Sequence, residues 1–537
     1  MKPLFFRLYI ILVCILFAAC SKSVTTAGPV DPPVTPLPAP PPVSYDYKSD
    51  YAYNLNVVYF VPNDVVEPAE YHRRLSEILL QAQSFFGDEM QRNGYGNKSF
   101  GLLKDEIKKR VQLIVIKGKQ GRSAYPYEGG ANAVMNEINS FRAANASMFS
   151  SDHYLVILPA TQYDANGEPG GVPFYGLGKF CFALDYAEQD IKYLGTGGVL
   201  GTRAVKWIGG MIHELGHGLN LPHNCQKVSE GASLGMALMW AGNSTWGVSK
   251  TFLTAADCAV LNVNQVFSKE KKAFYGEKNA SIKRIHASYD DVKQSIIVKG
   301  IFASNETVTD ILYYNDPNVN NEGIGVNRDY NAVAWTSKPI GTDSFYVEMP
   351  VAELQYKTNE VYELKVKLAL SNGLIRETIY PYSFVNGIPR LEFSTRDELS
   401  KEGWSIASFS SEETASENGA VTNLIDGDLS SYWHSRWSTN AAVYPHEIVI
   451  KTGENIVAAG FSIAQRPGLA RAVKDLELLI SLDGISYQSA GVSRLANSSG
   501  LQYFSFAAPQ TVKYIKLIAR SSWDGEKFAS LGEFGLF

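Results

Sequence analysis

Residues 213–223 read HELGHGLNLPH, and this stretch is the most informative part of the sequence. Residues four apart in a helix share one face, so His213 and His217 can present two imidazoles to one metal ion, with Glu214 beside them. His223 follows at the spacing of a third ligand. Three protein ligands leave one position of a tetrahedral zinc ion open for a water molecule, whose proton a glutamate can accept. The stretch predicts a zinc hydrolase site with Glu214 as general base.

The residues before and within the stretch are typical of a buried helix. Apolar side chains recur at spacings of three and four, at Val205, Ile208, Ile212, Leu215 and Leu219. This stripe is separate from the face that carries the histidines. Four glycines, at Gly209, Gly210, Gly216 and Gly218, weaken the helix and indicate close backbone packing or clearance over a cleft.

The same stretch resembles the extended HExxHxxGxxH motif of metzincin metallopeptidases, which implies an α/β zincin domain and endopeptidase activity. Asn220 stands where the family has a glycine of positive φ, and asparagine is the residue that best tolerates that conformation after glycine. Glu230 is the alternative third ligand, as in zincins that use a downstream glutamate. Pro222 favours His223 because it fixes a turn directly before it.

Metzincins also have a methionine turn beneath the zinc, and residues 235–247 (GMALMWAGNSTWG) offer Met236 and Met239. The resemblance favours Met239, and the alternative is that both are ordinary core methionines. Some metzincins place a tyrosine two residues after this methionine, where this chain has Ala241. The group that stabilises the oxyanion is therefore left open.

The amino terminus predicts a bacterial lipoprotein. Basic residues precede an apolar run, and residues 16–20 (LFAAC) resemble a lipobox, which implies a signal peptide over 1–20 and lipidation of Cys20. An uncleaved signal anchor is the alternative. Residues 21–45 form a Pro-rich tether. We expect an outer-membrane lipoprotein on the cell surface or the periplasmic face, held to the membrane by its lipid anchor only.

Composition and cysteine usage narrow the class further. With 45% hydrophobic residues, 19% charged residues and a net charge of -5, the chain has no basic excess for nucleic acid. We expect a monomer. The mature cysteines are Cys181, Cys225 and Cys258. Cys225 and Cys258 flank the methionine segment and are the candidate disulfide, with three buried thiols as the alternative.

Patterning divides the chain into three folded parts. Residues 46–275 alternate strand and helix, as suits the zinc peptidase domain. We expect strands at 54–62, 111–117 and 153–160, a long helix at 68–93, a helix at 254–266, and an edge strand within 172–186 that lines the cleft and could bind peptide by strand addition. Residues 276–391 read as alternating strands, at 282–291, 295–303, 344–351, 360–370 and 376–387, which predicts an immunoglobulin-like β-sandwich that acts as a spacer.

Residues 392–537 resemble a factor V/VIII type C, or discoidin, domain, which implies a jelly-roll β-sandwich shared with family 32 carbohydrate-binding modules. The resemblance rests on residues 423–437 (NLIDGDLSSYWHSRW), 480–488 (ISLDGISYQ) and 532–537 (GEFGLF). It implies a calcium site, for which oxygen ligands are suitable, at Asp426, Asp428, Ser431 and Glu533. Simple turn chemistry is the alternative for these residues. His434, Trp437 and Arg466 are the candidates for glycan binding, and Trp433 is expected in the core.

The sequence therefore predicts a multidomain, lipid-anchored, zinc-dependent endopeptidase that hydrolyses protein or glycoprotein substrates, with a C-terminal domain that targets it to glycans. The cofactors would be Zn²⁺ and, at the second site, Ca²⁺. The alternative is a non-catalytic glycan-binding or adhesin lipoprotein with a vestigial zincin domain. The intact Glu214 favours the enzyme, because a purely structural zinc site has no need of that base.

Overall fold

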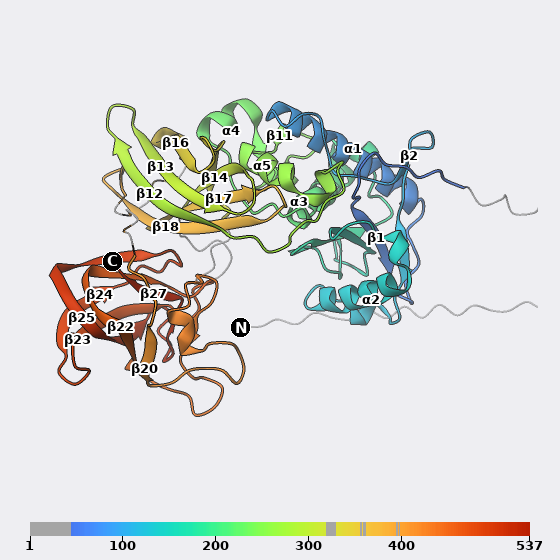
Figure 1. Ribbon diagram of the computed structural model, residues 1–537. Helices are drawn as coiled ribbons and strands as arrows, with labels where there is room; N and C mark the ends of the chain where they lie inside the picture. The colour runs from blue at the N-terminus through green and yellow to red at the C-terminus, as the bar shows by residue number, and fades with distance from the viewer. Residues whose placement is uncertain are drawn as a thin grey trace, which may run out of the picture. The chain divides into compact units, whose positions relative to one another are not determined.

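The computed structural model describes residues 44–317, 329–354, 357, 361–391, 393, 396 and 398–537 (Figure 1). The predicted signal peptide, the lipidation site Cys20 and nearly all of the predicted tether lie outside the described residues. Within the described residues, no helix is both long enough and apolar enough to cross a membrane.

The first folded part is built on a five-stranded sheet in the order β4-β1-β5-β9-β8. Its strands are β1 (Asn56–Val61), β4 (Ile114–Lys117), β5 (Tyr154–Pro159), β8 (Gly176–Leu177) and β9 (Phe180–Asp185). Four are parallel, and β8 pairs antiparallel with β9 at the edge. The strands expected at 54–62, 111–117 and 153–160 are confirmed, and the expected edge strand is a short hairpin arm.

Helices cover both faces of this sheet (Figure 1). The helices α1 (Tyr71–Arg92) and α3 (Gly198–Gly218) pack on one face, where Val57 and Tyr59 point, and α2 (Gly130–Ala144) packs on the other, where Val58 and Phe60 point. This alternation along β1 follows from the period of two in a strand. Strands buried on both faces read as continuous apolar runs, which is why their positions could be predicted.

Smaller elements complete this part. They are β2 (Lys104–Asp105) paired with β3 (Arg110–Val111), β6 (Gln162–Tyr163) paired with β7 (Pro169–Gly170), β10 (Met236–Ala237) paired with β11 (Thr251–Phe252), α4 (Val228–Leu234) and α5 (Ala255–Val263). The expected helices at 68–93 and 254–266 correspond to α1 and α5.

The second part consists of two antiparallel sheets. One contains β12 (Ala280–Asp290), β13 (Ser295–Ser304) and β16 (Ser344–Pro350), and the other, in the order β15-β14-β17-β18-β19, contains β15 (Val333–Ser337), β14 (Val308–Pro317), β17 (Val361–Leu370), β18 (Ile375–Val385) and β19 (Ile388–Arg390). The two sheets face each other across a shared core. The strands β14 and β15 were not among the segments expected from the sequence.

The outer face of the second sheet shares a core with the first part. Along β14, Ile311 and Tyr313 point into the core between the two sheets, whereas Leu312 and Tyr314 join the same apolar cluster as α1, α3 and α5. Ala332 and Ala334 also belong to that cluster. The expectation of a simple spacer is therefore wrong in one respect, because this sandwich is packed into the core of the part before it.

The third part has its own core around the buried Trp433, as expected. Its sheet has the order β20-β22-β25-β23-β24, with β27 also paired to β22. The strands are β20 (Ser405–Phe409), β22 (His446–Ala464), β23 (Val473–Ser481), β24 (Gln488–Arg494), β25 (Gln502–Ser522) and β27 (Glu533–Leu536), and β21 (Trp433–His434) pairs with β26 (Ser530–Leu531). The chain is thus multidomain and mostly β.

The expected disulfide between Cys225 and Cys258 is wrong, because all three cysteines of the described chain are free and buried. Cys225 lies in the core of the two-sheet part, whereas Cys258 lies in α5 within the core of the first part. Packing therefore draws the two thiols into different clusters. The alternative of three buried thiols is the one that the structure shows.

Candidate functional sites

The helix α3 carries the first three residues of the candidate metal centre. His213, Glu214 and His217 stand in its last two turns, and the helix ends at Gly218. Asn220 then takes a left-handed conformation with φ 69°, which confirms its expected role in place of glycine. The amide of Leu221 donates to the carbonyl of Gly216 (3.0 Å), and this turn brings the chain back toward the helix.

The structure brings His213, His217 and His223 together. One ligand nitrogen from each lies within 4.8 Å of the others, and no other such group of three histidine, cysteine or acidic residues occurs in the described part of the chain. Nε2 of His217 and Nε2 of His223 are 3.0 Å apart. Nitrogens bound to one tetrahedral zinc ion at 2.0–2.1 Å would be about 3.3 Å apart, so the donor set fits zinc with little movement.

Backbone carbonyls orient two of these rings. His213 donates from Nδ1 to the carbonyl of Leu238 (2.8 Å), and His217 donates from Nδ1 to the carbonyl of Leu221 (2.9 Å). Because Nδ1 holds the proton in each ring, Nε2 is left as the metal-binding atom. Burial, with a smaller effect of His217, lowers the pKa of His213 to about 4, so this imidazole is neutral near pH 7.

The structure also shows where Met239 and Glu230 lie relative to the three histidines. Met239 is fully buried, and a Cβ added to Gly216 would lie 2.5 Å from its sulfur, so Met239 packs against α3 between the two histidines. Met236 is half-buried in β10. Glu230 instead caps α4, where it accepts from the backbone amide of Lys227 (3.0 Å) and pairs with its ammonium (2.8 Å). Glu230 is not part of the histidine group.

A cleft of about 780 Å³ contains the three histidines and Glu214. Three aromatic side chains line its walls, those of Tyr127, Phe174 and Tyr175. The glycines of the β8 hairpin also line it. The rings of Tyr127 and Tyr175 meet edge to face, with centroids 5.7 Å apart. A Cβ on Gly176 would lie 2.4 Å from Cβ of His217, so only glycine lets the edge strand run this close to the metal centre.

Two lining residues come from the second part and were missed by the sequence analysis. Asp329 and Tyr330 precede β15, and the Tyr330 ring stacks on the ring of His223 at a centroid distance of 3.7 Å and an angle of 21°. A signal was present in the sequence, because residues 315–331 (NDPNVNNEGIGVNRDYN) interrupt the strand pattern. Long insertions of this kind in compact domains are often functional.

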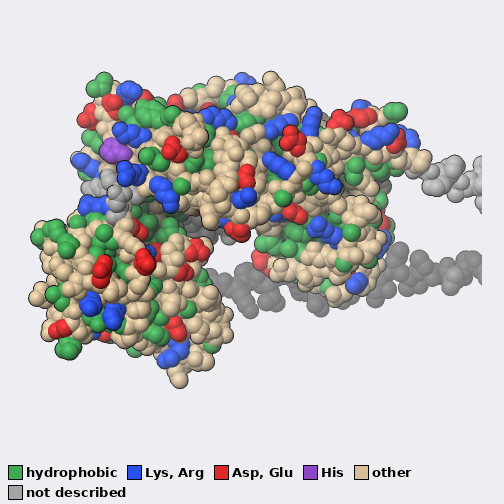
Figure 2. Space-filling view, viewed as in Figure 1, with side chains coloured by type: hydrophobic (Ala, Val, Ile, Leu, Met, Phe, Trp, Pro, Cys, Tyr) green, Lys and Arg blue, Asp and Glu red, His purple; other side chains and the backbone are tan. Residues whose placement is uncertain are grey.

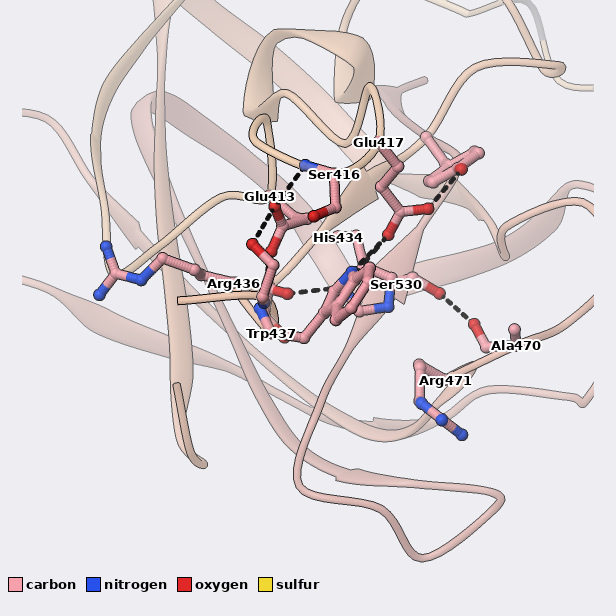
Figure 3. Close-up of polar contacts among 12 residues, drawn as sticks. Glu413, Ser416, Glu417, His434, Arg436, Trp437, Ala470, Arg471 and Ser530 are labelled. Atoms are coloured by element: carbon pink, nitrogen blue, oxygen red, sulfur yellow. Dashed lines mark hydrogen bonds and ion pairs between the residues drawn. The ribbon is translucent and has the colours of Figure 1, made fainter. Parts of the chain in front are cut away.

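A second candidate site lies in the third part. Its cavity of about 310 Å³ is lined by all three predicted glycan-binding residues, His434, Trp437 and Arg466, together with Glu417 and Phe528. Glu417 connects two of these residues. It accepts from Nε1 of Trp437 (2.9 Å) (Figure 3) and from the guanidinium of Arg466 (3.2 Å). His434 is buried, whereas Trp437 is 43% exposed. Trp437 therefore offers the larger surface to a ligand.

The loop that presents Trp437 is fixed by a second acid, Glu413 (Figure 3). Glu413 is buried and accepts from the backbone amides of Ser416, Trp437 and Ser438. These hydrogen bonds lower its pKa to about 2, so it stays ionised at any ordinary pH. The arrangement offers an aromatic face beside polar groups, which is what a sugar ring requires.

The four residues of the expected calcium site are neighbours with partners of their own. Ser431 donates to Asp426 (2.8 Å), Asp428 accepts from the amide of Ser430 (2.8 Å), and Glu533 accepts from the amide of Gly427 (3.0 Å). Lys401 forms an ion pair with Glu533. Burial raises the pKa of Glu533 to about 7, and Lys401 opposes this effect. Calcium binding here stays a prediction.

Charged side chains of both signs lie on the surface of the molecule (Figure 2). On the face shown in Figure 2, basic and acidic side chains are interspersed rather than gathered by sign. This agrees with the small net charge of -5.

Known proteins resemble the third part of the chain and, separately, a larger share of the chain. A family model of the F5/8 type C domain matches residues 406–534, which confirms the discoidin-type third part. The crystal structure of OgpA from Akkermansia muciniphila is 39% identical, with 64% of this chain and 95% of that chain covered and a TM-score of 0.59. An inactive OgpA in complex with an O-glycopeptide (glycodrosocin) substrate matches at 38% identity, with the same coverage and TM-score.

A sialidase of Micromonospora viridifaciens is 36% identical over 138 residues, which is 25% of this chain and 21% of the sialidase. The chain thus spans about a fifth of that relative's length. The sialidase is a hydrolytic enzyme by name, and the inactive OgpA holds an O-glycopeptide substrate.

Proposed function

Because the chain belongs to the family of OgpA from Akkermansia muciniphila, we propose that it is a zinc-dependent endopeptidase that cleaves glycosylated proteins. The observation that carries the proposal is the convergence of three imidazole nitrogens within 4.8 Å of one another, beside Glu214, in one cleft. Within this proposal the first part is a metzincin-like zincin domain, and Met239 is its methionine turn.

The chain's own residues divide the chemistry between them. His213, His217 and His223 would hold the metal through Nε2, and Leu238 and Leu221 would fix two of the rings through Nδ1. Bound zinc would lower the pKa of a water molecule and polarise the substrate carbonyl. Glu214, half-buried at the cleft wall, accepts the proton from the attacking water and passes it to the leaving amine.

The substrate class follows from the walls of the cleft. A peptide can add as a further strand to the edge strand β8, whose glycines let its backbone lie close to the histidines. The exposed ring of Tyr127 and the adjoining Tyr175 offer aromatic faces on which a sugar can stack. We therefore propose an O-glycosylated peptide as substrate, the class of ligand found with inactive OgpA.

The third part would bind glycans separately through Trp437, Arg466 and His434. Tethering a weak glycan binder to a peptidase raises the local concentration of substrate without changing the chemistry. Attachment to the outer membrane through Cys20 would complete a surface enzyme that meets glycoproteins outside the cell. Calcium at Asp426, Asp428, Ser431 and Glu533 would be a structural addition to this domain.

The test is cleavage of an O-glycopeptide and of the same peptide without its sugar, with zinc content measured on the same preparations. Wild type should hold about one zinc per chain. Glu214→Gln should keep the zinc and lose cleavage by at least about a thousandfold. Glu230→Gln, a change in an acid of the same segment outside the cleft, is the matched control and should retain both. A wild type that contains no zinc, or an active Glu214→Gln, contradicts the proposal.

A further inference from the structure

We infer that the β-sandwich that follows the catalytic part is itself a component of the metal centre, with Tyr330 as a positioning residue for His223. The inference rests on the proposed function, because it assigns a role toward the proposed zinc site. Sequence patterning treated this sandwich as a spacer without chemistry, and its contacts with the histidine cluster require a different role.

The position of His223 depends on packing more than that of the other two ligands. His213 and His217 belong to α3, a helix of 21 residues whose geometry fixes their spacing. His223 lies five residues beyond the end of that helix, after the left-handed turn at Asn220. Its ring is covered by Tyr330, stacked at 3.7 Å and nearly parallel. This ring contact limits how far the imidazole can tilt.

The backbone beside His223 is held by the same segment of the sandwich. The amide of Cys225 donates to the carbonyl of Ala332 (2.8 Å), and Cys225 forms a parallel bridge with Val333. The amide of Ala332 in turn donates to the carbonyl of Asp329 (2.9 Å). The segment 329–333 therefore contacts the third ligand through a side chain and holds the chain two residues after it through the backbone.

A buried ionic cluster anchors this segment to the sandwich. Lys365, in the middle of β17, pairs with Asp329 (2.5 Å), with Asp316 at the end of β14 (2.9 Å) and with Glu363 (3.4 Å). The side chain of Lys365 is only 8% exposed, so its charge is stabilised mainly by these carboxylates. This ion pair holds Asp329 against a central strand. Because Tyr330 is the next residue, the ion pair also restricts the position of its backbone.

The zinc dissociation constant of the full chain measures this role directly, by competition with a chromogenic chelator. Tyr330→Phe keeps the stacked ring and should bind zinc within about threefold of wild type. Tyr330→Leu and Tyr330→Ala lose the aromatic face and should weaken zinc binding by about 10-fold to 100-fold, the range seen when a group that orients a metal ligand is removed. Tyr127→Ala removes another aromatic ring of the same cleft that is not stacked on a histidine, and should leave zinc affinity unchanged.

The visible spectrum of the Co²⁺-substituted protein gives a second readout, because it responds to ligand geometry. It should change in Tyr330→Leu and not in Tyr127→Ala. Zinc affinity and cobalt spectrum both equal to wild type in Tyr330→Leu would overturn the inference while leaving the proposed function intact. A wild-type chain that binds no zinc would instead contradict the proposed function, and this inference with it.

Discussion

Replacing Arg74 by methionine should reveal how strongly the first sheet depends on one buried ion pair. The guanidinium of Arg74, 2% exposed, donates to Oδ1 of Asp185 (2.6 Å), and Asp185 is fully buried at the end of β9. Arg74 also donates to the carbonyls of Tyr186 and Gln189, each at 3.0 Å. After the substitution, Asp185 keeps two donors, the hydroxyl of Tyr59 at 2.8 Å and the backbone amide of Tyr186.

The magnitude follows from the cost of an uncompensated buried charge. Removing one partner of a buried pair costs about 3–5 kcal/mol of folding free energy. Burial raises the pKa of Asp185 above its usual range even with Arg74 present, and the pKa will rise further without it. A carboxyl group whose folded pKa is raised binds more protons in the folded state. The stability of Arg74→Met should therefore fall by about 1.4 kcal/mol per pH unit between the unfolded and folded pKa values of Asp185.

The assay is urea unfolding of the full chain at several pH values between 5 and 8, for wild type, Arg74→Met and Arg74→Met/Asp185→Asn. The single variant should lose stability steadily as the pH rises, because a charged Asp185 is the source of its cost. The double variant has no charge to compensate, so it should be less destabilised near pH 8 and show no such slope. A single variant within about 1 kcal/mol of wild type at every pH would show that the charge of Asp185 does not depend on Arg74 for its stabilisation.

Three further changes probe the two sites. Asn220→Ala should destabilise the chain by about 1 kcal/mol in thermal unfolding, because alanine tolerates the left-handed φ of 69° less well than asparagine, whereas Asn220→Gly should not add strain. Glu413→Gln should lower the unfolding temperature near neutral pH; because the folded pKa of Glu413 is depressed to about 2, the difference from wild type should shrink as the pH falls from about 4.5 toward 2. Trp437→Ala should weaken binding to a glycan array at least about tenfold with little change in stability, since this side chain is 43% exposed.

Much of the metal site could be predicted because its determinants are local in sequence. The spacing of His213 and His217 is a property of the helix, and the left-handed conformation of Asn220 follows from the short path to His223. Pro222 favoured His223 over Glu230 as the third ligand, and the structure adds that the carboxylate of Glu230 caps α4 instead. The zincin assignment of the surrounding domain stays a prediction from this motif.

The missed features depend on contacts between distant segments. The strand β14 pairs with β17 and β15, and one of its faces packs against α5, so its sequence VTDILYYNDP is apolar on both faces and lacks alternation. The interruption at residues 315–331 indicated a long connection, but without β14 and β15 the sequence could not place Tyr330 at the cleft. The disulfide prediction failed for a similar reason, because proximity to one segment in sequence does not determine which core receives each thiol.

The three buried cysteines allow local opening of the native protein to be measured by the rate at which each thiol is alkylated. Burial raises the pKa of the Cys225 thiol to about 12 and those of Cys181 and Cys258 well above their usual range, so few thiolates are available to an alkylating reagent while the chain is closed. Cys181 lies on β9, Cys225 beside the third histidine, and Cys258 on α5. Each thiol should be modified at the rate at which the structure around it opens. Equal rates at Cys181, Cys225 and Cys258 would show that the sheet, the loop with the third histidine and the contact with the sandwich open together, and different rates would show that they open separately.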